Sequence, residues 1–578
     1  MEMVNITIDG IKTQVPKDYT VLEAAKSLDI NIPTLCHLKG INEVGACRIC
    51  VVEVKGARTL QASCVQPVSE GMEVRTCSRD VMEARKTILD LLLSSHEREC
   101  LTCSRNLNCE LQKLSDEMGI DKVSYETHKT KYAVDDVSPS IVRDQNKCVL
   151  CGRCIAVCRD IQHTGAINFA NRGVRAAVTP AYYKPLAEAN CINCGQCIKV
   201  CPVGALREKD DTHKVWNALG DPDLHVVVQT APAVRVGLGE EFGMPVGTNV
   251  EGKMITALKR LGFDKVFDTN FSADLTILEE GTELLNRINN GGKLPLITSC
   301  SPGWIKFCEH NYHEFLDNLS SCKSPQQMLG AVAKSYYAQK AGIDPKNIFV
   351  VSIMPCTAKK YECDREEMAV DGLQDVDVVL TTRELAKMIK QARINFAALA
   401  EGEYDSILGD STGAAVIFGA TGGVMEAALR TVADILTGED LKRIEYIPVR
   451  GMEGIKEATV NINGVDVKVA VAHSTGNAAK LLDKIKSGEA NYHFIEVMAC
   501  PGGCINGGGQ PILMNKEKTE EVMKLRAQGL YKIDAERKFR KSHENSEVKK
   551  LYEEYLGEPN SHKAHHLLHT KYTERERS

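Results

Sequence analysis

The chain has 578 residues, 43% of them hydrophobic and 26% charged, which is the composition of an ordinary multidomain globular protein. Its 71 basic and 77 acidic residues give a net charge of -6, which argues against nucleic acid or an acidic membrane as a partner. The segment "MEMVNITIDG" lacks a secretion-signal pattern, and no apolar run reaches the ~18 residues of a membrane span. We therefore expect a cytoplasmic protein.

Residues 1–79 predict a small β domain with one metal site. "NITIDGIKTQV" has the pattern of two strands about an Asp-Gly turn, and "DYTVLEAAKSLDI" that of a helix capped by Asp or Thr. A loop-rich stretch then carries Cys36, Cys47, Cys50 and Cys64. Four thiolates suit a 2Fe–2S cluster or, as the alternative, zinc. The long first gap departs from the plant-type spacing and requires a longer loop.

Cysteine is the unusual component of the whole chain. There are 23 cysteines, most of them in closely spaced groups. A disulfide scaffold is disfavoured because the expected compartment is reducing, so the groups favour metal or redox sites.

Residues 80–125 predict a second site. "DVMEARKTILDLLLSSH" is typical of an amphipathic helix that ends at His96. Cys100, Cys103 and Cys109 follow at the spacing HxxxCxxCxxxxxC. One imidazole and three thiolates could hold zinc or a 4Fe–4S cluster, and the neighbouring electron-carrier motifs favour the cluster.

Residues 138–209 contain two copies of CxxCxxCxxxC, which form the pattern of a two-cluster bacterial ferredoxin. In this pattern the fourth cysteine of each run binds the other cluster. One predicted 4Fe–4S cluster therefore has the ligands Cys148, Cys151, Cys154 and Cys201, and the other has Cys191, Cys194, Cys197 and Cys158.

Residues 210–578 alternate strand-like runs such as "LHVVVQTAPAV" with helical patterns, which favours a large α/β domain with a charged, helical C-terminal tail. The whole chain is thus predicted to be multidomain α/β and α+β. Its parts are a β-grasp 2Fe–2S domain, a Cys3His cluster domain, a two-cluster ferredoxin domain and this large α/β domain.

Three segments of the last domain carry a resemblance: "TSCSPGW" (298–304), "MPCTAKKYE" (354–362) and "EVMACPGGCINGGGQP" (496–511). The last two place a cysteine at the end of an apolar strand, and the glycines of the third allow close approach to a bulky cofactor. These segments resemble the signatures of iron-only (FeFe) hydrogenases. The upstream clusters follow the order found in clostridial-type members, so the resemblance spans the whole chain.

The resemblance implies reversible reduction of protons to H2 at an H-cluster. This cofactor is a 4Fe–4S cube joined through a cysteine sulfur to a two-iron unit that carries CO, cyanide and azadithiolate. By position, Cys356, Cys500 and Cys504 would be ligands, with Cys504 bridging, and Lys359 would hold a cyanide. The implied pocket contacts are Pro232, Gln326, Met354, Met498 and Ala233, the last of which stands where some relatives have a serine.

A proton path is also implied. Glu280, Glu283 and Arg287 lie three and four residues apart on one helix face, a pattern that ordinarily indicates a solvated surface. Similarity to the family instead implies a path through Arg287, Glu283, Ser320 and Glu280 to Cys300, whose thiol would be the last proton carrier.

Ser301 breaks the family pattern, because relatives with "TSCCPGW" have a cube ligand at this position. Three hypotheses stay open. Ser301 binds iron through oxygen, Cys300 has become the ligand, or Cys322 supplies the fourth ligand. We favour Ser301 at the ligand position with Cys300 as proton carrier. Cys77, Cys308 and Cys363 are expected to be buried free thiols.

The leading functional hypothesis is a hydrogenase that receives electrons from ferredoxin through its accessory clusters. The alternative is the catalytic subunit of an electron-bifurcating complex that also uses NADH. Because the chain has no glycine-rich NAD or flavin fingerprint, that chemistry would need partner subunits. A hydrogen sensor with little turnover is the third hypothesis, which a complete proton path argues against.

Overall fold

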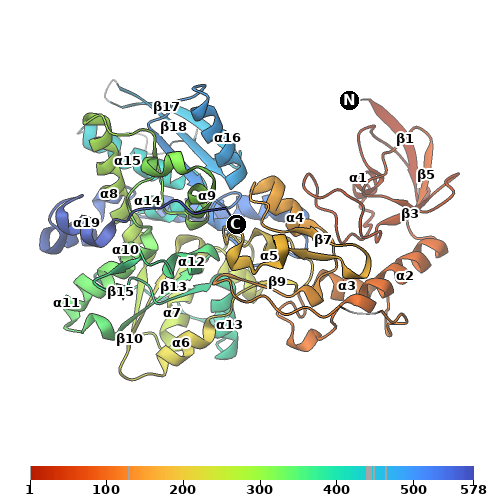
Figure 1. The fold of residues 1–578 in the computed structure, drawn as a ribbon, viewed down its shortest axis with the longest axis horizontal. Helices are drawn as coiled ribbons and strands as arrows, with labels where there is room; N and C mark the ends of the chain where they lie inside the picture. The colour runs from red at the N-terminus through yellow and green to blue at the C-terminus, as the bar shows by residue number, and fades with distance from the viewer. Residues whose placement is uncertain (1, 128–129, 438–445, 447–448, 463–464, 578) are drawn as a thin grey trace.

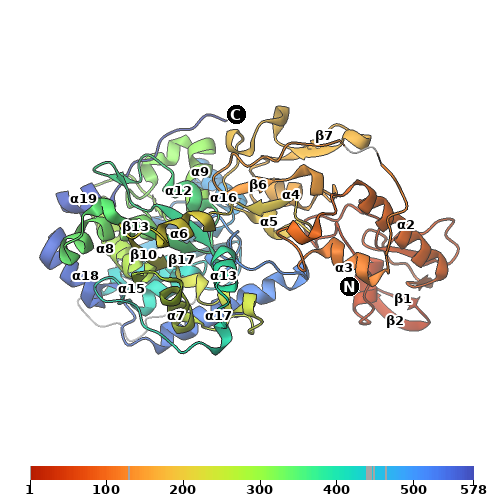
Figure 2. The same ribbon diagram turned by 90° about the horizontal axis from the view of Figure 1, so that it is seen from below.

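The structure, a computed structural model, describes residues 2–127, 130–437, 446, 449–462 and 465–577. Figures 1 and 2 show a row of parts, with the N-terminal domain at one end, the cysteine-rich segments in the middle and a large lobe at the other end. Within these described ranges, no helix has both the length and the apolar character needed to cross a membrane.

The N-terminal domain is a five-stranded sheet in the order β2-β1-β5-β3-β4, and the predicted hairpin is confirmed as the antiparallel pair β1 and β2. The helix α1 begins after Thr20, whose side chain accepts from the Glu23 N–H while Glu23 accepts from the Thr20 N–H. The cap is therefore Thr20. The elements are β1 Met3–Ile8, β2 Ile11–Pro16, α1 Val21–Lys26, β3 Val51–Val54, β4 Gln61–Ala62 and β5 Met72–Arg75.

The middle of the molecule has little regular structure. The helix α2 (Arg79–Ser95) confirms the predicted amphipathic helix, and it leads to His96. Two short helices each begin after a left-handed glycine in a CxxC turn, Gly152 at φ 79° and Gly195 at φ 68°. The other elements are α3 Glu110–Glu117, β6 Ile141–Arg143, α4 Arg153–Ala156, β7 Asn168–Ala170, β8 Ala177–Thr179, α5 Gln196–Val200 and β9 Leu206–Glu208.

The large lobe is built around two four-stranded sheets, which confirms its α/β character. The first sheet, in the order β11-β10-β13-β16, is entirely parallel. The second, in the order β12-β19-β18-β17, is parallel except for the antiparallel β17. The strands are β10 His225–Thr230, β11 Lys265–Asp268, β12 Leu296–Ile297, β13 Ile348–Met354, β16 Val378–Thr381, β17 Ile455–Ile462, β18 Val465–His473 and β19 Phe494–Met498. A separate small hairpin pairs β14 Ala369–Val370 with β15 Leu373–Gln374.

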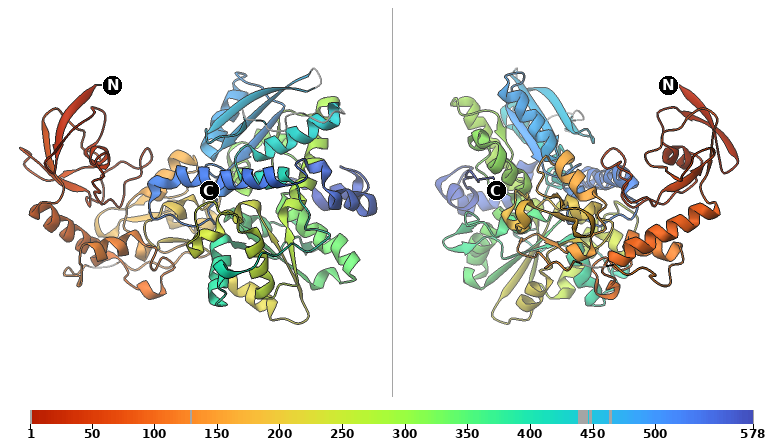
Figure 3. Two further views of the ribbon diagram at one scale, coloured as in Figure 1. Left: turned by 180° about the vertical axis from the view of Figure 1, so that it is seen from behind. Right: turned by 45° about the vertical axis from the view of Figure 1, so that its right-hand side comes forward.

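Helices cover both sheets, and α17 lies across the lobe below β17 and β18 (Figure 3). The helices are α6 Thr212–Leu219, α7 Glu251–Leu261, α8 Thr269–Asn289, α9 Pro302–Asn311, α10 Pro325–Val332, α11 Ala338–Ala341, α12 Ala358–Cys363, α13 Thr382–Gln391, α14 Gly413–Val416, α15 Gly423–Thr437, α16 Thr475–Lys486, α17 Thr519–Glu536, α18 Ser546–Leu551 and α19 His562–Leu568.

The strands of the first sheet, together with β12 and β19 of the second, are almost completely buried and rich in valine and isoleucine, as expected for parallel strands covered on two faces. The antiparallel edge strand β17 is mostly exposed or half-buried. Because the carboxyl ends of parallel strands are where functional residues gather, this arrangement places the segments after β12, β13 and β19 where a site can form.

Candidate functional site

The three signature segments meet at one cavity of about 90 Å³. Cys356 follows β13 by two residues, and Cys500 follows β19 by two residues. The predicted residues that line it are Cys300, Ser301, Cys356, Cys500, Cys504, Lys359, Pro232, Gln326, Met354 and Met498. The structure thus brings together side chains that lie more than 250 residues apart in the sequence, from 232 to 504.

The sulfur atoms at this cavity are desolvated. Burial raises the pKa of Cys504 to about 12, and burial together with Glu280 raises the pKa of Cys300 well above its ordinary value. Thiols so placed ionise only when a cation compensates the charge, and iron is such a cation. Converging soft donors in an apolar cavity therefore fit the iron–sulfur cofactor that the motifs imply.

Ala233 does not line this cavity. Its side chain is fully buried and packs in an apolar cluster with Val416 and Leu530. The prediction that Ala233 contacts the cofactor therefore finds no support in the cavity lining. Sequence reasoning missed other lining residues, of which Cys194, Thr269 and Phe418 are examples.

Two glycines of "GGCINGGGQP", Gly508 and Gly509, serve a different purpose from the predicted one, whereas Gly503 and Gly507 line the cavity. Of the last three glycines in this motif, only Gly507 lines the cavity. A Cβ atom on Gly508 would lie 2.4 Å from the Cys194 carbonyl oxygen, and one on Gly509 would lie 2.8 Å from the Thr381 Cβ. At those two positions the missing side chain makes room for other protein segments instead of a cofactor.

Ser301 faces the cavity at the start of α9. Its Oγ accepts a hydrogen bond of 3.1 Å from the backbone N–H of Ala499, the residue before Cys500. Cys322 does not line the cavity: it is completely buried, and its Sγ lies 4.0 Å from the Glu283 carboxylate.

Lys359 is fixed by a network that the sequence did not reveal. Its Nζ donates to the Cys300 carbonyl oxygen at 3.1 Å and to Glu362 Oε2 at 2.8 Å. Glu362 Oε2 also accepts from Ser324 Oγ at 2.9 Å and from Gln326 Nε2 at 3.1 Å. Glu362 therefore positions two cavity-lining side chains at once. The motif "MPCTAKKYE" contained this residue, but nothing in the pattern indicated its partners.

The predicted proton-path residues form a connected row on α8 and the loop before α10. Arg287 donates to Glu283 at 2.6 Å, and Ser320 Oγ donates to the other Glu283 oxygen at 2.9 Å. Glu280 is 3% exposed, so the solvated-surface interpretation does not apply to it. Burial, and secondarily the charge of Glu283, raises the pKa of Glu280 to about 8.

The two predicted ferredoxin-type cysteine sets are each brought together. A second cavity is lined by Cys148, Cys151, Cys154 and Cys201, which are the four residues expected to share one cluster. In the other set, burial and then the neighbouring charge of Cys191 raise the pKa of Cys158 to about 11. Cys194 also lines the large-lobe cavity, so this set adjoins the candidate active site.

The four N-terminal cysteines lie in two close pairs. The Cys47 N–H donates to Cys36 Sγ at 3.5 Å, and the Sγ atoms of Cys50 and Cys64 are 3.3 Å apart. The pKa of Cys47 is lowered to about 6, chiefly by its hydrogen bond with Cys36. Two pairs of thiols, among which the Cys47 thiol ionises readily, fit a two-iron cluster.

Of the remaining cysteines, Cys308 and Cys363 are buried as predicted, but Cys77 is exposed. The prediction for Cys77 was wrong because this residue lies in the short connection between β5 and α2, at the surface of the domain.

The loop between Cys103 and Cys109 contains a buried cation that the described protein atoms satisfy only in part. Arg105 is 4% exposed, and its Nε donates to the Asn108 carbonyl oxygen. Its Nη1 and Nη2 have no acceptor among the described residues. The nearby Cys109 and Cys201 belong to two predicted cluster sites. Because an uncompensated buried cation is costly, these donors fit anionic iron–sulfur clusters beside them.

We expect Arg105→Gln to lower the midpoint potential of at least one of these two clusters, since a nearby cation favours the reduced, more negative state. At a fixed solution potential, the reduced-to-oxidised ratio should fall by about tenfold, equivalent to 59 mV for a one-electron couple. Potential titrations followed by electron paramagnetic resonance measure the shift. Arg98→Gln, at an exposed position just before Cys100, is the control, and equal shifts in both variants would contradict the assignment.

The fold and the site define an iron–sulfur oxidoreductase, with buried cysteine sites leading to a cavity between two sheets. Comparison with known proteins gives the same class. Residues 224–508 match the iron only hydrogenase large subunit, C-terminal domain, and residues 520–575 match the iron hydrogenase small subunit. The preceding segments match a 2Fe–2S binding domain (1–79), an NADH-ubiquinone oxidoreductase-G iron–sulfur region (85–124) and a 4Fe–4S dicluster domain (117–205).

Two full-length relatives are hydrogenases. The chain is 51% identical to the NADP-reducing hydrogenase subunit HndD of Solidesulfovibrio fructosivorans, with 100% of both chains covered. It is 47% identical to Iron hydrogenase 1 of Clostridium pasteurianum, over 99% of this chain and 100% of that one. A structure of [FeFe]-hydrogenase HydA1 from Chlamydomonas reinhardtii, 44% identical, matches with a TM-score of 0.57 over 63% of this chain and 98% of that one.

The chain belongs to the iron-only hydrogenase family. It is an oxidoreductase that acts on H2, and it combines accessory 2Fe–2S and 4Fe–4S domains with the H-cluster catalytic domain.

Proposed function

We propose that this hydrogenase interconverts protons and H2 with ferredoxin as its electron partner, and that Arg287, Glu283, Ser320, Glu280 and Cys300 carry the protons. The single observation that supports turnover is the row of hydrogen-bonded or adjacent groups that reaches the cavity from α8. The H-cluster, when bound, supplies the redox chemistry. The proposed domains are residues 1–79, 80–125 and 138–209, which hold the accessory clusters, and residues 210–578, which hold the H-cluster.

In this proposal the protein groups have separate tasks. Glu280 holds a proton within the buried region, because its pKa of about 8 keeps it neutral at pH 7. Cys300, whose pKa is raised by burial, stays a neutral thiol that can donate at the cavity. Lys359, held by Glu362, places a cation at the cavity wall. Cys356, Cys500 and Cys504 are the proposed cluster ligands there.

The test of this function is H2 evolution by the matured full chain with reduced ferredoxin and, separately, with a reduced one-electron dye. We expect turnover with both donors. Infrared CO and cyanide bands without any H2 evolution would favour the hydrogen sensor and overturn the proposal.

A second candidate is the catalytic subunit of a complex that exchanges electrons with a nicotinamide nucleotide. It is supported by the full-length similarity to a subunit that is named NADP-reducing. Nicotinamide-dependent activity would appear only when flavin-containing partner subunits are added, and ferredoxin would then no longer be the sole donor.

We further propose that Ser301 occupies the position of the fourth cube ligand, which its place on the cavity wall supports. Ser301→Cys should then change the spectrum and the potential of the cube, because a thiolate is a softer donor than a serine oxygen. Electron paramagnetic resonance and Mössbauer spectra provide the measurement. Cys322→Ser is the comparison variant, and it should leave both unchanged. Spectra that respond to Cys322→Ser and not to Ser301→Cys would reverse the assignment.

A further inference from the structure

The β7–β8 hairpin and the segment that follows it carry exposed apolar side chains next to cations. Val174 is 70% exposed, Tyr182 is 93% exposed and Phe169 is 51% exposed. Large apolar side chains this accessible in one short segment indicate an interaction surface. We define the hairpin patch as Phe169, Arg172, Val174, Arg175, Tyr182 and Lys184.

The parts of the hairpin patch lie together in space. β7 and β8 pair antiparallel, with Phe169 opposite Val178. At the tip, Asn171 Nδ2 donates to the Arg175 carbonyl oxygen at 3.3 Å and also contacts the Tyr183 hydroxyl. These contacts hold the tip and the segment that carries Tyr182 in one surface. In Figure 2 the hairpin with β7 protrudes at the edge of the cysteine-rich part.

The charge of this segment is opposite to that of the chain. Residues 168–190 contain Arg172, Arg175 and Lys184 against one carboxylate, Glu188, whereas the chain as a whole has a net charge of -6. In the part of the chain that the structure describes, none of the three cations forms an ion pair. Unpaired cations beside exposed aromatic side chains favour a partner with a carboxylate-rich face.

The hairpin patch also adjoins two predicted cluster sites. The Phe169 ring lies 3.6 Å from where a Cβ atom on Gly152 would be, and Gly152 stands in the turn between Cys151 and Cys154. Asn42 donates to the carbonyl oxygens of Cys151 at 3.1 Å and of Cys36 at 2.7 Å. A partner on this surface would therefore lie beside a predicted 4Fe–4S site, close to the place where Asn42 connects that site to the predicted 2Fe–2S site.

We infer that the hairpin patch is the docking surface for a small acidic iron–sulfur electron carrier of the ferredoxin class. This inference rests on the proposed function. Arg172, Arg175 and Lys184 attract and orient the carrier, and Phe169, Val174 and Tyr182 form the apolar centre of the contact.

The test compares two electron donors on the matured full chain, a bacterial 2[4Fe–4S] ferredoxin and reduced methyl viologen. In the double variant Arg172→Glu/Arg175→Glu, we expect KM for ferredoxin to rise at least about tenfold while the dye-driven rate is unchanged. Added salt should raise the wild-type KM and affect the variant much less, because exposed charges are screened.

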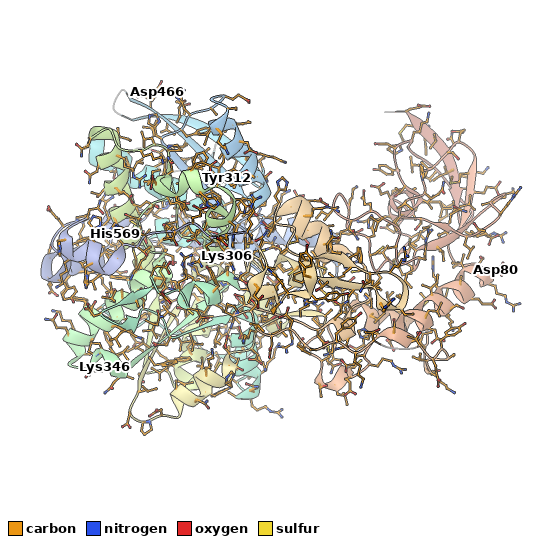
Figure 4. The ribbon with its side chains drawn as sticks, in the orientation of Figure 1. Asp80, Lys306, Tyr312, Lys346, Asp466 and His569 are labelled. Atoms are coloured by element: carbon orange, nitrogen blue, oxygen red, sulfur yellow. The ribbon has the colours of Figure 1, made fainter. Side chains whose placement is uncertain are left out.

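Lys346→Glu is the matched control, since Lys346 is an exposed lysine on the large lobe, far from β7 (Figures 1 and 4). Tyr182→Ala should raise KM without changing its salt dependence. An unchanged KM in the double variant, the same effect from Lys346→Glu, or a wild-type enzyme that ferredoxin cannot drive would each overturn the docking surface.

Two measurements separate this inference from its premise. Iron content verifies that the double variant is loaded, and Arg172→Gln/Arg175→Gln provides a milder change with a smaller expected rise in KM. If the wild type produced no H2 with the reduced dye, the proposed function itself would be refuted. Normal dye-driven rates with unaltered ferredoxin kinetics in both double variants would refute only the docking surface.

Discussion

Cys300→Ala should lower H2 evolution by about 10²-fold or more, because it removes the proposed last proton carrier at the cavity. Glu280 and Lys359 both influence this thiol, and no other proposed path residue lines the cavity. The infrared CO and cyanide bands and the iron content should be retained, since Cys300 is proposed to carry protons and not to bind iron. Dye-driven H2 evolution at saturating donor measures the loss.

The control for this variant is Cys308→Ala, which removes a buried thiol of the same helix region that does not line the cavity. Its rate should stay close to that of the wild type. If Cys300→Ala lost the infrared bands together with the rate, Cys300 would be a ligand and the hypothesis for Ser301 would fail. A rate within twofold of the wild type would remove Cys300 from the proton path.

Glu280→Gln should reduce H2 evolution to a similar extent, about 10²-fold or more, because the amide keeps the shape of the side chain but cannot exchange a proton. The raised pKa of about 8 also predicts a pH dependence. The wild-type rate of H2 evolution should fall as the pH rises through 8, where Glu280 loses its proton. The residual rate of the variant should lack this alkaline limb.

Stability provides a second readout of the same group. Glu280 binds its proton more tightly in the folded state than in the unfolded state, where its pKa is about 4.5. Its contribution to stability is therefore complete below about pH 4.5 and is lost as the pH rises toward 8. Glu280→Gln should flatten the decrease in thermal stability over this interval.

Glu279, next to Glu280 in the sequence, offers a matched control for Glu280→Gln. Glu279 accepts from Tyr552 and bonds the Nε2 of His569 at 3.0 Å, and the His569 Nδ1 lies 2.8 Å from Ser321 Oγ. Figure 4 places His569 at the outer end of the large lobe. Glu279→Gln should weaken the attachment of this tail and lower stability, with little change in turnover per folded enzyme. Equal rate losses in both variants would contradict a specific role for Glu280.

Periodicity and cysteine spacing were sufficient for much of the fold. Apolar runs predicted β10, β13 and β19, and the capping pattern predicted α1, because these signals depend on residues that are close in sequence. Spacing also predicted that Cys201 of the second ferredoxin repeat lies with the first three cysteines of the first repeat. Cys148 and Cys201 line one cavity although 53 residues separate their numbers.

Patterns of neighbouring residues could not predict the contacts between segments that lie far apart in the sequence. Nothing in the sequence indicated that Glu362 would anchor both Lys359 and Gln326. Nor did it indicate that Nη1 and Nη2 of the buried Arg105 would lack an acceptor among the described residues. The packing of Ala233 in an apolar cluster was not predicted either, since family position does not specify which face of a short helical turn meets the cavity. These features depend on packing, which no pattern along one chain encodes directly.

At Gly508 the active-site loop packs directly against the ferredoxin-type segment that carries Cys194 and Gly195. The Thr357 hydroxyl donates to the Asn193 carbonyl oxygen at 2.7 Å, and Gln196 donates to the Asn506 carbonyl oxygen at 3.0 Å. Beside them, Gly195 and Gly508 leave no room for side chains. The ferredoxin-type turn therefore forms one wall of the active-site loop. A fragment that began at residue 210 would lose this wall, so we expect its active-site loop to be less stable than that of the full chain.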